Sequence, residues 1–140
     1  MRQQMLDRLD SELAFNRSAL NLRSYRQELL ASNIANADTP HFKARDIEFK
    51  SALADVMAGR TQGDLALART STRHLTGADG SRYGVELKYR AEYQGAVDGN
   101  TVNMDVERSA FAENAVQTEA LITFVRDQFQ QMTNALNPGQ

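Results

Sequence analysis

Hydrophobic residues in the first 37 positions recur at intervals of three and four, which is the spacing of an α-helix. At about 100° per residue these residues fall on two opposite sides of the helix. One side carries Leu22, Tyr25 and Leu29, and the other carries Leu20, Leu30 and Ile34. A helix that is apolar on two sides needs two partners. We therefore expect one side to pack within the chain and the other to contact neighbouring molecules. The residues expected on such intermolecular faces are Leu20, Leu22, Leu29, Leu30 and Ile34.

The strongest hydrophobic period lies near the end of the chain, where apolar positions step by four and three without a break. This is the a/d pattern of a coiled-coil seam, in a helix of about thirty residues and roughly 45 Å. The seam residues are Phe111, Ala115, Thr118, Ile122, Val125, Phe129, Met132 and Leu136. Val116 and Phe124 fall off the seam, so we expect them on further intermolecular faces. Asn103 or Thr101 can cap the start of this helix, and Asn137-Pro138-Gly139 ends it.

The first helix must stop before Pro40, which has no amide hydrogen and disfavours helical backbone at Thr39. Short polar side chains around this point can satisfy the backbone groups that a helix end leaves unpaired. We therefore predict a structural turn without catalytic part, built from Asn33, Ile34, Ala35, Asn36, Asp38, Thr39 and Pro40.

The middle of the chain differs from both ends, because seven of the eight glycines fall between Gly59 and Gly99. We predict a short helix near residues 47–57, with an irregular crossing segment as the alternative. We also predict two short strands near residues 65–67 and 85–89, which together could form a small hairpin. The expected fold is mainly α. Residues 1–46 and 101–140 form a discontinuous coiled-coil-like helical domain, and residues 47–100 form a loop-rich, partly β insertion.

Composition narrows the possible functions. The net charge of −2 gives no electrostatic footprint for nucleic acid, and the absence of cysteine excludes disulfides and thiolate chemistry. Aromatic residues are only 7% of the chain, which argues against a large compact core. Neither a cleaved secretion signal nor a bilayer-spanning segment is expected. His41 and His74 have no spacing that joins them into a site, so we expect no enzyme activity, no metal or other cofactor and no small-molecule substrate.

Two segments carry a resemblance to a known family. The run ALNLRSYRQELLASNIANADTPHFKARDIEF, with its Asn-Ile-Ala-Asn-Ala-x-Thr-Pro core, and the run DGNTVNMDVERSAFAEN resemble the bacterial flagellar rod and hook family. The resemblance covers both ends of the chain and not the middle. The chain departs from the family at two positions: His41 stands where many relatives have glycine, and Asn103 stands where aspartate is expected.

The resemblance implies a structural subunit of the proximal rod in the flagellar basal body. Terminal helices of such proteins line a hollow axial shaft that transmits torque. The implied partners are copies of the chain itself, other rod proteins, the adaptor that joins the rod to the membrane ring, and the flagellar type III export apparatus. The implied location is the periplasmic rod, reached without a cleaved signal peptide. The alternative is a soluble helical adaptor or export chaperone that binds one client through its apolar helix faces.

Overall fold

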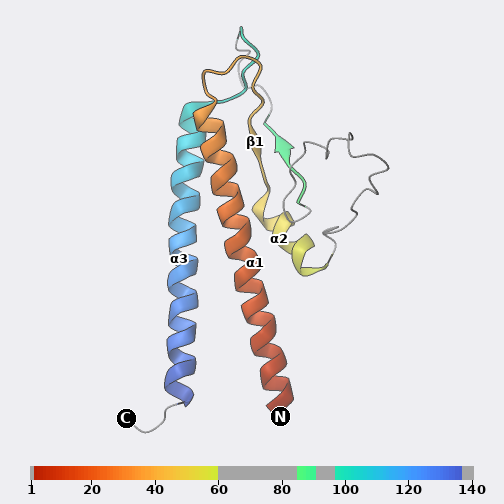
Figure 1. The fold of residues 1–140 in the computed structure, drawn as a ribbon, viewed down its shortest axis with the longest axis vertical. Helices are drawn as coiled ribbons and strands as arrows, with labels where there is room; N and C mark the ends of the chain where they lie inside the picture. Colours follow the sequence, from red (N-terminus) through yellow and green to blue (C-terminus); the bar gives the residue numbers. More distant parts are fainter. Residues whose placement is uncertain (1, 60–84, 91–96, 137–140) are drawn as a thin grey trace, which may run out of the picture.

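In a computed structural model of the chain, which describes residues 2–59, 85–90 and 97–136, two long antiparallel helices lie side by side. The helix α1 spans Arg2–Ala35 and the helix α3 spans Met104–Leu136. The start of α1 and the end of α3 lie at the same end of the molecule (Figure 1). The prediction of a mainly α fold with packed terminal helices is therefore confirmed.

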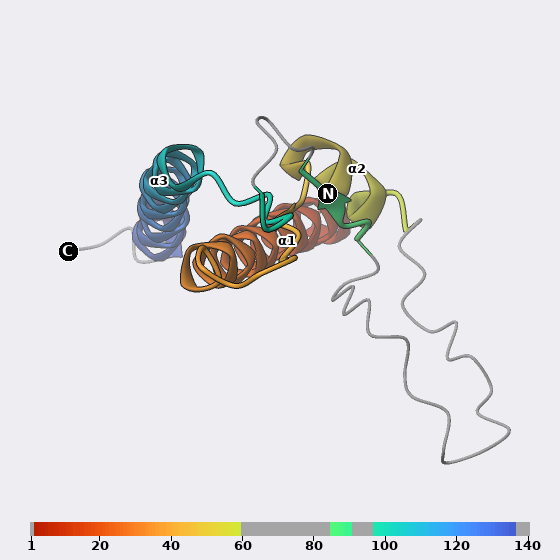
Figure 2. The ribbon, with the colours of Figure 1, turned by 90° about the horizontal axis from the view of Figure 1, so that it is seen from above.

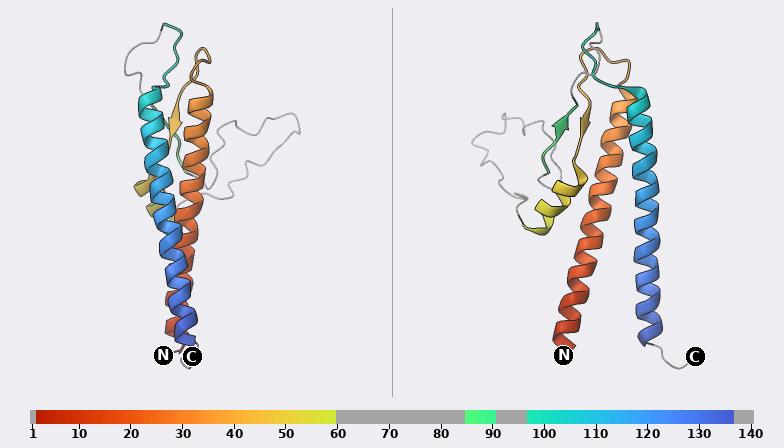
Figure 3. Two further views of the ribbon diagram at one scale, coloured as in Figure 1. Left: turned by 90° about the vertical axis from the view of Figure 1, so that its left-hand side faces the viewer. Right: turned by 180° about the vertical axis from the view of Figure 1, so that it is seen from behind.

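A smaller layer packs against one side of α1 (Figures 2 and 3). It contains the strand β1 at Arg45–Asp46, the helix α2 at Phe49–Met57 and the strand β2 at Lys88–Tyr89. The two strands pair in antiparallel orientation, with Arg45 opposite Tyr89 and Asp46 opposite Lys88. The short helix was predicted, but β2 pairs with the segment after α1. The other predicted strand, at residues 65–67, lies outside the described residues.

The hydrophobic core lies between α1 and this smaller layer. Leu22, Tyr25 and Leu29 of α1 are buried against Ile47, Ala52 and Val85. Phe49, Leu53, Val56 and Leu87 complete the cluster from its edge. One apolar side of α1 is thus covered within the chain, although Leu22 and Leu29 on that side were expected on intermolecular faces.

Helix ends follow local sequence signals. The helix α1 ends at Ala35, two to three residues before the end that Pro40 predicts near Ala37 or Asp38, and turns lead from there to Pro40. The side-chain oxygen of Asn103 accepts hydrogen bonds from the backbone amides of Asp105 (3.1 Å) and Val106 (3.3 Å), which confirms the predicted cap of α3. Among the described helices, none combines the length and the apolar character needed to cross a bilayer. The division into residues 1–46 with 101–140 and residues 47–100 stays a prediction.

Candidate functional site

The polar turn predicted from the sequence is a dense hydrogen-bonded structure. Asn33, in the last turn of α1, is 1% exposed. Its amide nitrogen donates to the carbonyl oxygen of Arg45 (2.8 Å), and its amide oxygen accepts from the Arg45 amide (3.0 Å). Thr39 donates through its hydroxyl to Asn36, and Asn36 donates to the Ser32 carbonyl. The Asn33 side chain therefore pairs with both backbone groups of Arg45, as the backbone of a neighbouring strand would.

Asn100 closes this turn from the other end of the sequence. Its buried side-chain nitrogen donates to the backbone carbonyls of Asn36 (3.0 Å), Ala37 (2.8 Å) and Thr39 (2.9 Å). Its side-chain oxygen accepts from the Val102 amide at 2.8 Å. We call the contact between Asn100 and these three carbonyls the Asn100 clasp. The clasp satisfies carbonyls that the end of α1 leaves without helical partners.

His41 lies at the tip of the turn in a left-handed backbone conformation, with φ of 59°. An L-residue with a side chain adopts this conformation at a cost, whereas glycine does so freely. Glycine would therefore suit this position on physical grounds. Opposite it, Gly99 has φ of 71°, and a Cβ added there would lie 3.0 Å from the His41 ring nitrogen Nδ1. His41 is exposed, and we assign it no chemical role.

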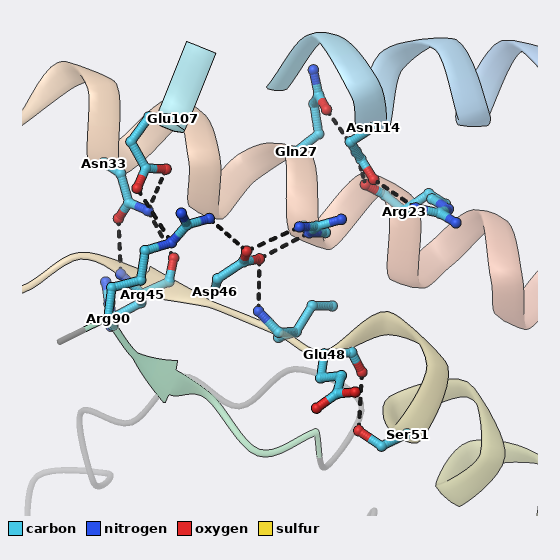
Figure 4. A network of polar contacts seen from close by, with 12 residues as sticks. Arg23, Gln27, Asn33, Arg45, Asp46, Glu48, Ser51, Arg90, Glu107 and Asn114 are labelled. Carbon is cyan, nitrogen blue, oxygen red and sulfur yellow. Dashed lines mark hydrogen bonds and ion pairs between the residues drawn. The ribbon is translucent and has the colours of Figure 1, made fainter. Parts of the chain in front are cut away.

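A cluster of charges follows the turn where β1 passes between α1 and β2 (Figure 4). Asp46 accepts two hydrogen bonds from Arg26 (2.9 and 3.0 Å) and one from Arg90 (2.8 Å). Burial opposes ionisation of Asp46, but the hydrogen bonds and charges of Arg26, the Ile47 amide and Arg90 outweigh it and lower the pKa of this carboxyl. The hydrogen bond to Asp46 raises the pKa of Arg26. The cluster therefore holds α1, β1 and the residue after β2 together.

The interface between α1 and α3 contains three layers of polar side chains, which we call the polar layers. In the first layer, Glu107 is fully buried, and its Oε2 accepts from Asn33 at 3.1 Å. Its Oε1 lies 3.4 Å from Nε of Arg90 and has no hydrogen bond within the described part of the chain. This layer connects α3 to the turn and to the charge cluster (Figure 4).

The second layer is centred on Asn114, which is also fully buried. It donates to the Arg23 carbonyl (3.0 Å) and to the Gln27 side chain (2.6 Å), and it accepts from the Arg23 guanidinium (3.3 Å). That guanidinium also lies over the Phe49 ring, 3.6 Å from its centroid. Burial lowers the pKa of Arg23.

The third layer joins the middle of α1 to the C-terminal part of α3. Asn16, 5% exposed, donates to Gln128 at 2.9 Å, and Gln128 donates to Glu12 at 2.7 Å. The layers therefore place Glu107, Asn114 and Gln128 on the side of α3 that faces α1.

The predicted coiled-coil seam divides into two rows along α3. Phe111, Thr118, Val125 and Met132 are half-buried beside the polar layers. Ala115, Ile122 and Phe129 lie seven residues apart on a neighbouring face and are exposed. Ile122 is 45% exposed and Phe129 is 48% exposed. We call these three residues the outer row. The side chain of Leu136, the last predicted seam residue, lies outside the described residues.

The residues predicted on intermolecular faces have different environments. Leu22, Leu29 and Leu30 are buried within the chain, so they cannot contact another molecule in this fold; the smaller layer covers Leu22 and Leu29. Leu20 and Ile34 are half-buried. Val116 is 70% exposed and Phe124 is 60% exposed. Phe124 also borders a groove of 510 Å³, whose other lining residues are Ser11, Glu12, Phe15, Asn16, Met57 and Gln128.

Sequence reasoning did not identify the buried polar residues or the Asp46 cluster. Polar residues in a helix normally indicate a solvated face, so Glu107 and Asn114 gave no signal by residue type. Their separation by seven residues, repeated at Leu121 and Gln128, was the available signal.

A family model described as "Flagella basal body rod protein" matches residues 13–43, which include most of α1 and the turn closed by the Asn100 clasp. The flagellar basal body rod protein FlgB of Salmonella typhimurium (strain LT2) is 49% identical over 137 residues, which cover 96% of this chain and 99% of the relative. The chain belongs to the FlgB family of flagellar basal body rod proteins.

Other FlgB proteins give the same result. That of Proteus mirabilis (strain HI4320) is 48% identical, with 96% of this chain and 100% of the relative covered. That of Escherichia coli (strain K12) is 47% identical, with 96% and 99% covered. Because these matches extend through the middle of the chain, they reach beyond the two segments on which the resemblance was based. They favour a structural rod subunit over a soluble adaptor or export chaperone.

Proposed function

We propose that this chain is a structural subunit of the proximal rod of the flagellar basal body and that it polymerises through outward faces of α1 and α3. Membership in the FlgB family supports the rod assignment. In this role the subunit transmits torque passively and catalyses no reaction. The finer elements of the proposal, namely the proximal position and the contacting faces, rest on the resemblance and on the surface of the helix pair.

The observation that carries the contact proposal is the outer row of α3. Ala115, Ile122 and Phe129 repeat every seven residues, so they form one continuous strip along about four turns of helix. Two of them are large hydrophobic residues that are almost half exposed. A soluble monomer gains nothing from such a strip, whereas a neighbouring helix could bury it in the manner of a coiled coil.

The faces that carry Val116 and Phe124 extend the proposed contact surface. Val116 lies about 100° or more from the outer row around α3, and Phe124 lies on the flank of the α1-facing side that is away from the outer row. A subunit with apolar residues on several sides of one helix fits a position with neighbours on several sides. We propose copies of this chain and other rod proteins as those neighbours.

Two further proposals come from the family resemblance. We propose the adaptor that joins the rod to the membrane ring as a partner at one end of the assembly. We also propose that the chain reaches the periplasmic rod through the flagellar type III export apparatus without a cleaved signal peptide.

Charge substitutions on the outer row test the contact proposal. We expect Ile122→Asp and Phe129→Asp to leave the helix content and unfolding midpoint of the isolated protein nearly unchanged, because both residues are largely exposed. Incorporation into the rod and swimming motility should be lost. Ala112→Asp, at another exposed position of α3, is the matched control and should assemble normally. Normal rods from both outer-row variants would refute the contact proposal.

Sedimentation of the concentrated protein separates the rod subunit from the adaptor. An adaptor should stop at a defined stoichiometry with its client, whereas a rod subunit should form larger assemblies as concentration rises. A protein that stays monomeric at high concentration and binds one client stoichiometrically would support the adaptor instead.

A further inference from the structure

The side of α3 that faces α1 is not its most hydrophobic side. The apolar seam predicted from the sequence is centred between the half-buried row and the outer row, whereas the polar layers are centred on Glu107, Asn114 and Gln128. At about 100° per residue these two directions differ by roughly 60° around the helix axis. An ordinary two-helix coiled coil would turn the seam inward and leave the polar residues in water.

From this arrangement we infer that the polar layers set the rotation of α3 about its own axis and thereby keep the outer row exposed. Each layer stabilises the observed orientation of α3 with specific hydrogen bonds. Turning α3 so that Ile122 and Phe129 face α1 would break the bonds from Asn114 to Arg23 and Gln27 and the bond between Asn16 and Gln128. The α1 partners of those groups would then be left against an apolar surface, which is costly for buried polar groups.

The side chains that α1 presents to α3 also favour the observed rotation of α3. The α3-facing surface of α1 carries Asn16, Arg23 and Gln27 between apolar residues, so a rotated α3 would set apolar side chains against these polar groups. The same helix places Leu22, Tyr25 and Leu29 toward the smaller layer. The device therefore lies in both helices: polar residues of α1, on the side that also carries Leu20, Leu30 and Ile34, pair with the polar layers of α3. Buried polar positions of this kind select one packing arrangement in coiled coils at some cost in stability.

The inference deepens the proposed function, because an exposed outer row is useful only if a neighbour covers it, but its test needs no assembly. The chain has no cysteine, so a single introduced thiol reports its own accessibility. Ala115→Cys reports the outer row, which is now exposed, and Gln117→Cys reports the opposite flank, which is now half-buried. Rotation must change the two reactivities in opposite directions.

The test combines each reporter with the double substitution Asn16→Leu and Gln27→Leu, which removes α1 partners of Gln128 and Asn114 and makes the α1 surface apolar. In dilute, monomeric protein we expect the thiol at position 115 to react about tenfold more slowly and the thiol at position 117 to react faster. Asn21→Leu adds the same side chain to another face of α1 and should change neither rate.

Other outcomes overturn the inference. Unchanged rates at both positions would mean that the polar layers do not determine the rotation. Slower reaction at both would indicate simple tightening of the helix pair. Faster reaction at both, or loss of helix content, would mean that the layers mainly hold α3 onto α1. Since all measurements are made on the monomer, failure here would leave the rod assignment untouched, and failure of the outer-row variants to affect rods would leave the rotation result standing.

Discussion

The Asn100 clasp predicts that one chemical change will have different effects at two positions three residues apart. Asn100→Asp replaces the amide donor with a carboxylate oxygen beside the carbonyls of Asn36, Ala37 and Thr39, now 2.8 to 3.0 Å from the donor nitrogen. The site is only 7% exposed. The lost donated bonds together contribute about 1 kcal/mol net, and the buried groups left unpaired cost about 1–3 kcal/mol. The expected destabilisation is therefore roughly 2–4 kcal/mol.

Asn103→Asp should behave differently because residue 103 is the exposed cap of α3. The new carboxylate can still accept from the amides of Asp105 and Val106. A negative charge at a helix N-terminus contributes about 0.3–1 kcal/mol, and repulsion from Asp105 offsets part of that gain. We therefore expect a change between zero and about 1 kcal/mol in the stabilising direction.

Urea unfolding at pH 7, followed by circular dichroism on dilute protein, measures both values under the same conditions. Equal unfolding free energies for the two variants would refute the assignment of the clasp. A decrease in unfolding free energy smaller than about 0.5 kcal/mol for Asn100→Asp would also refute the clasp, because removing a buried hydrogen-bond donor costs more than that.

Three further predictions follow from single sites. His41→Gly should stabilise the isolated protein by about 0.5–1 kcal/mol in urea unfolding, because relief of the left-handed backbone, about 1–2 kcal/mol, exceeds the entropy that glycine adds to the unfolded chain; a loss of stability would contradict this. The folded-state pKa of Asp46 is lowered, so its contribution to stability is complete above the unfolded pKa of about 3.9 and disappears as pH falls through the folded value. Asp46→Asn should therefore lower stability at pH 7 and flatten its decline in acid, and an unchanged acid profile would exclude the charge cluster as a cause. Leu22→Ala should cost about 2–5 kcal/mol in the same assay, while Val116→Ala, at a largely exposed position, should cost little; equal losses would contradict the position of the core.

The elements that sequence patterns predicted are those with a long hydrophobic period or with residues that mark a helix start or end. The two long helices have hydrophobic periods over many turns, and Pro40 and Asn103 mark a helix end and a helix start by their own chemistry. The short helix α2 was also found from the spacing of its apolar residues. In these cases the information is local, so the sequence alone carries it.

The missed features depend on partners far away in the sequence. The strand β1 has two residues, which is too short for alternation to be visible, and its pairing with β2 spans the middle of the chain. Asn100 reads as an ordinary turn residue until its three carbonyl partners are known, and Asn114 reads as a surface residue until Arg23 and Gln27 lie beside it. The seam prediction located the apolar residues of α3 but could not determine which way the helix faces.

The distribution of contacts along the sequence has a consequence for the order of folding. Arg26 and Asp46, which tie α1 to β1, are separated by 20 residues, whereas Asn16 and Gln128, which tie α1 to α3, are separated by 112. Loop-closure entropy makes the second contact costlier to form by roughly 1.5 kcal/mol, and its polar bonds offer less hydrophobic driving force than the core around Leu22. The segment from α1 to α2 should therefore collapse first and α3 should dock late. In a φ-value study, substitutions in α3 should then accelerate unfolding while leaving the refolding rate almost unchanged.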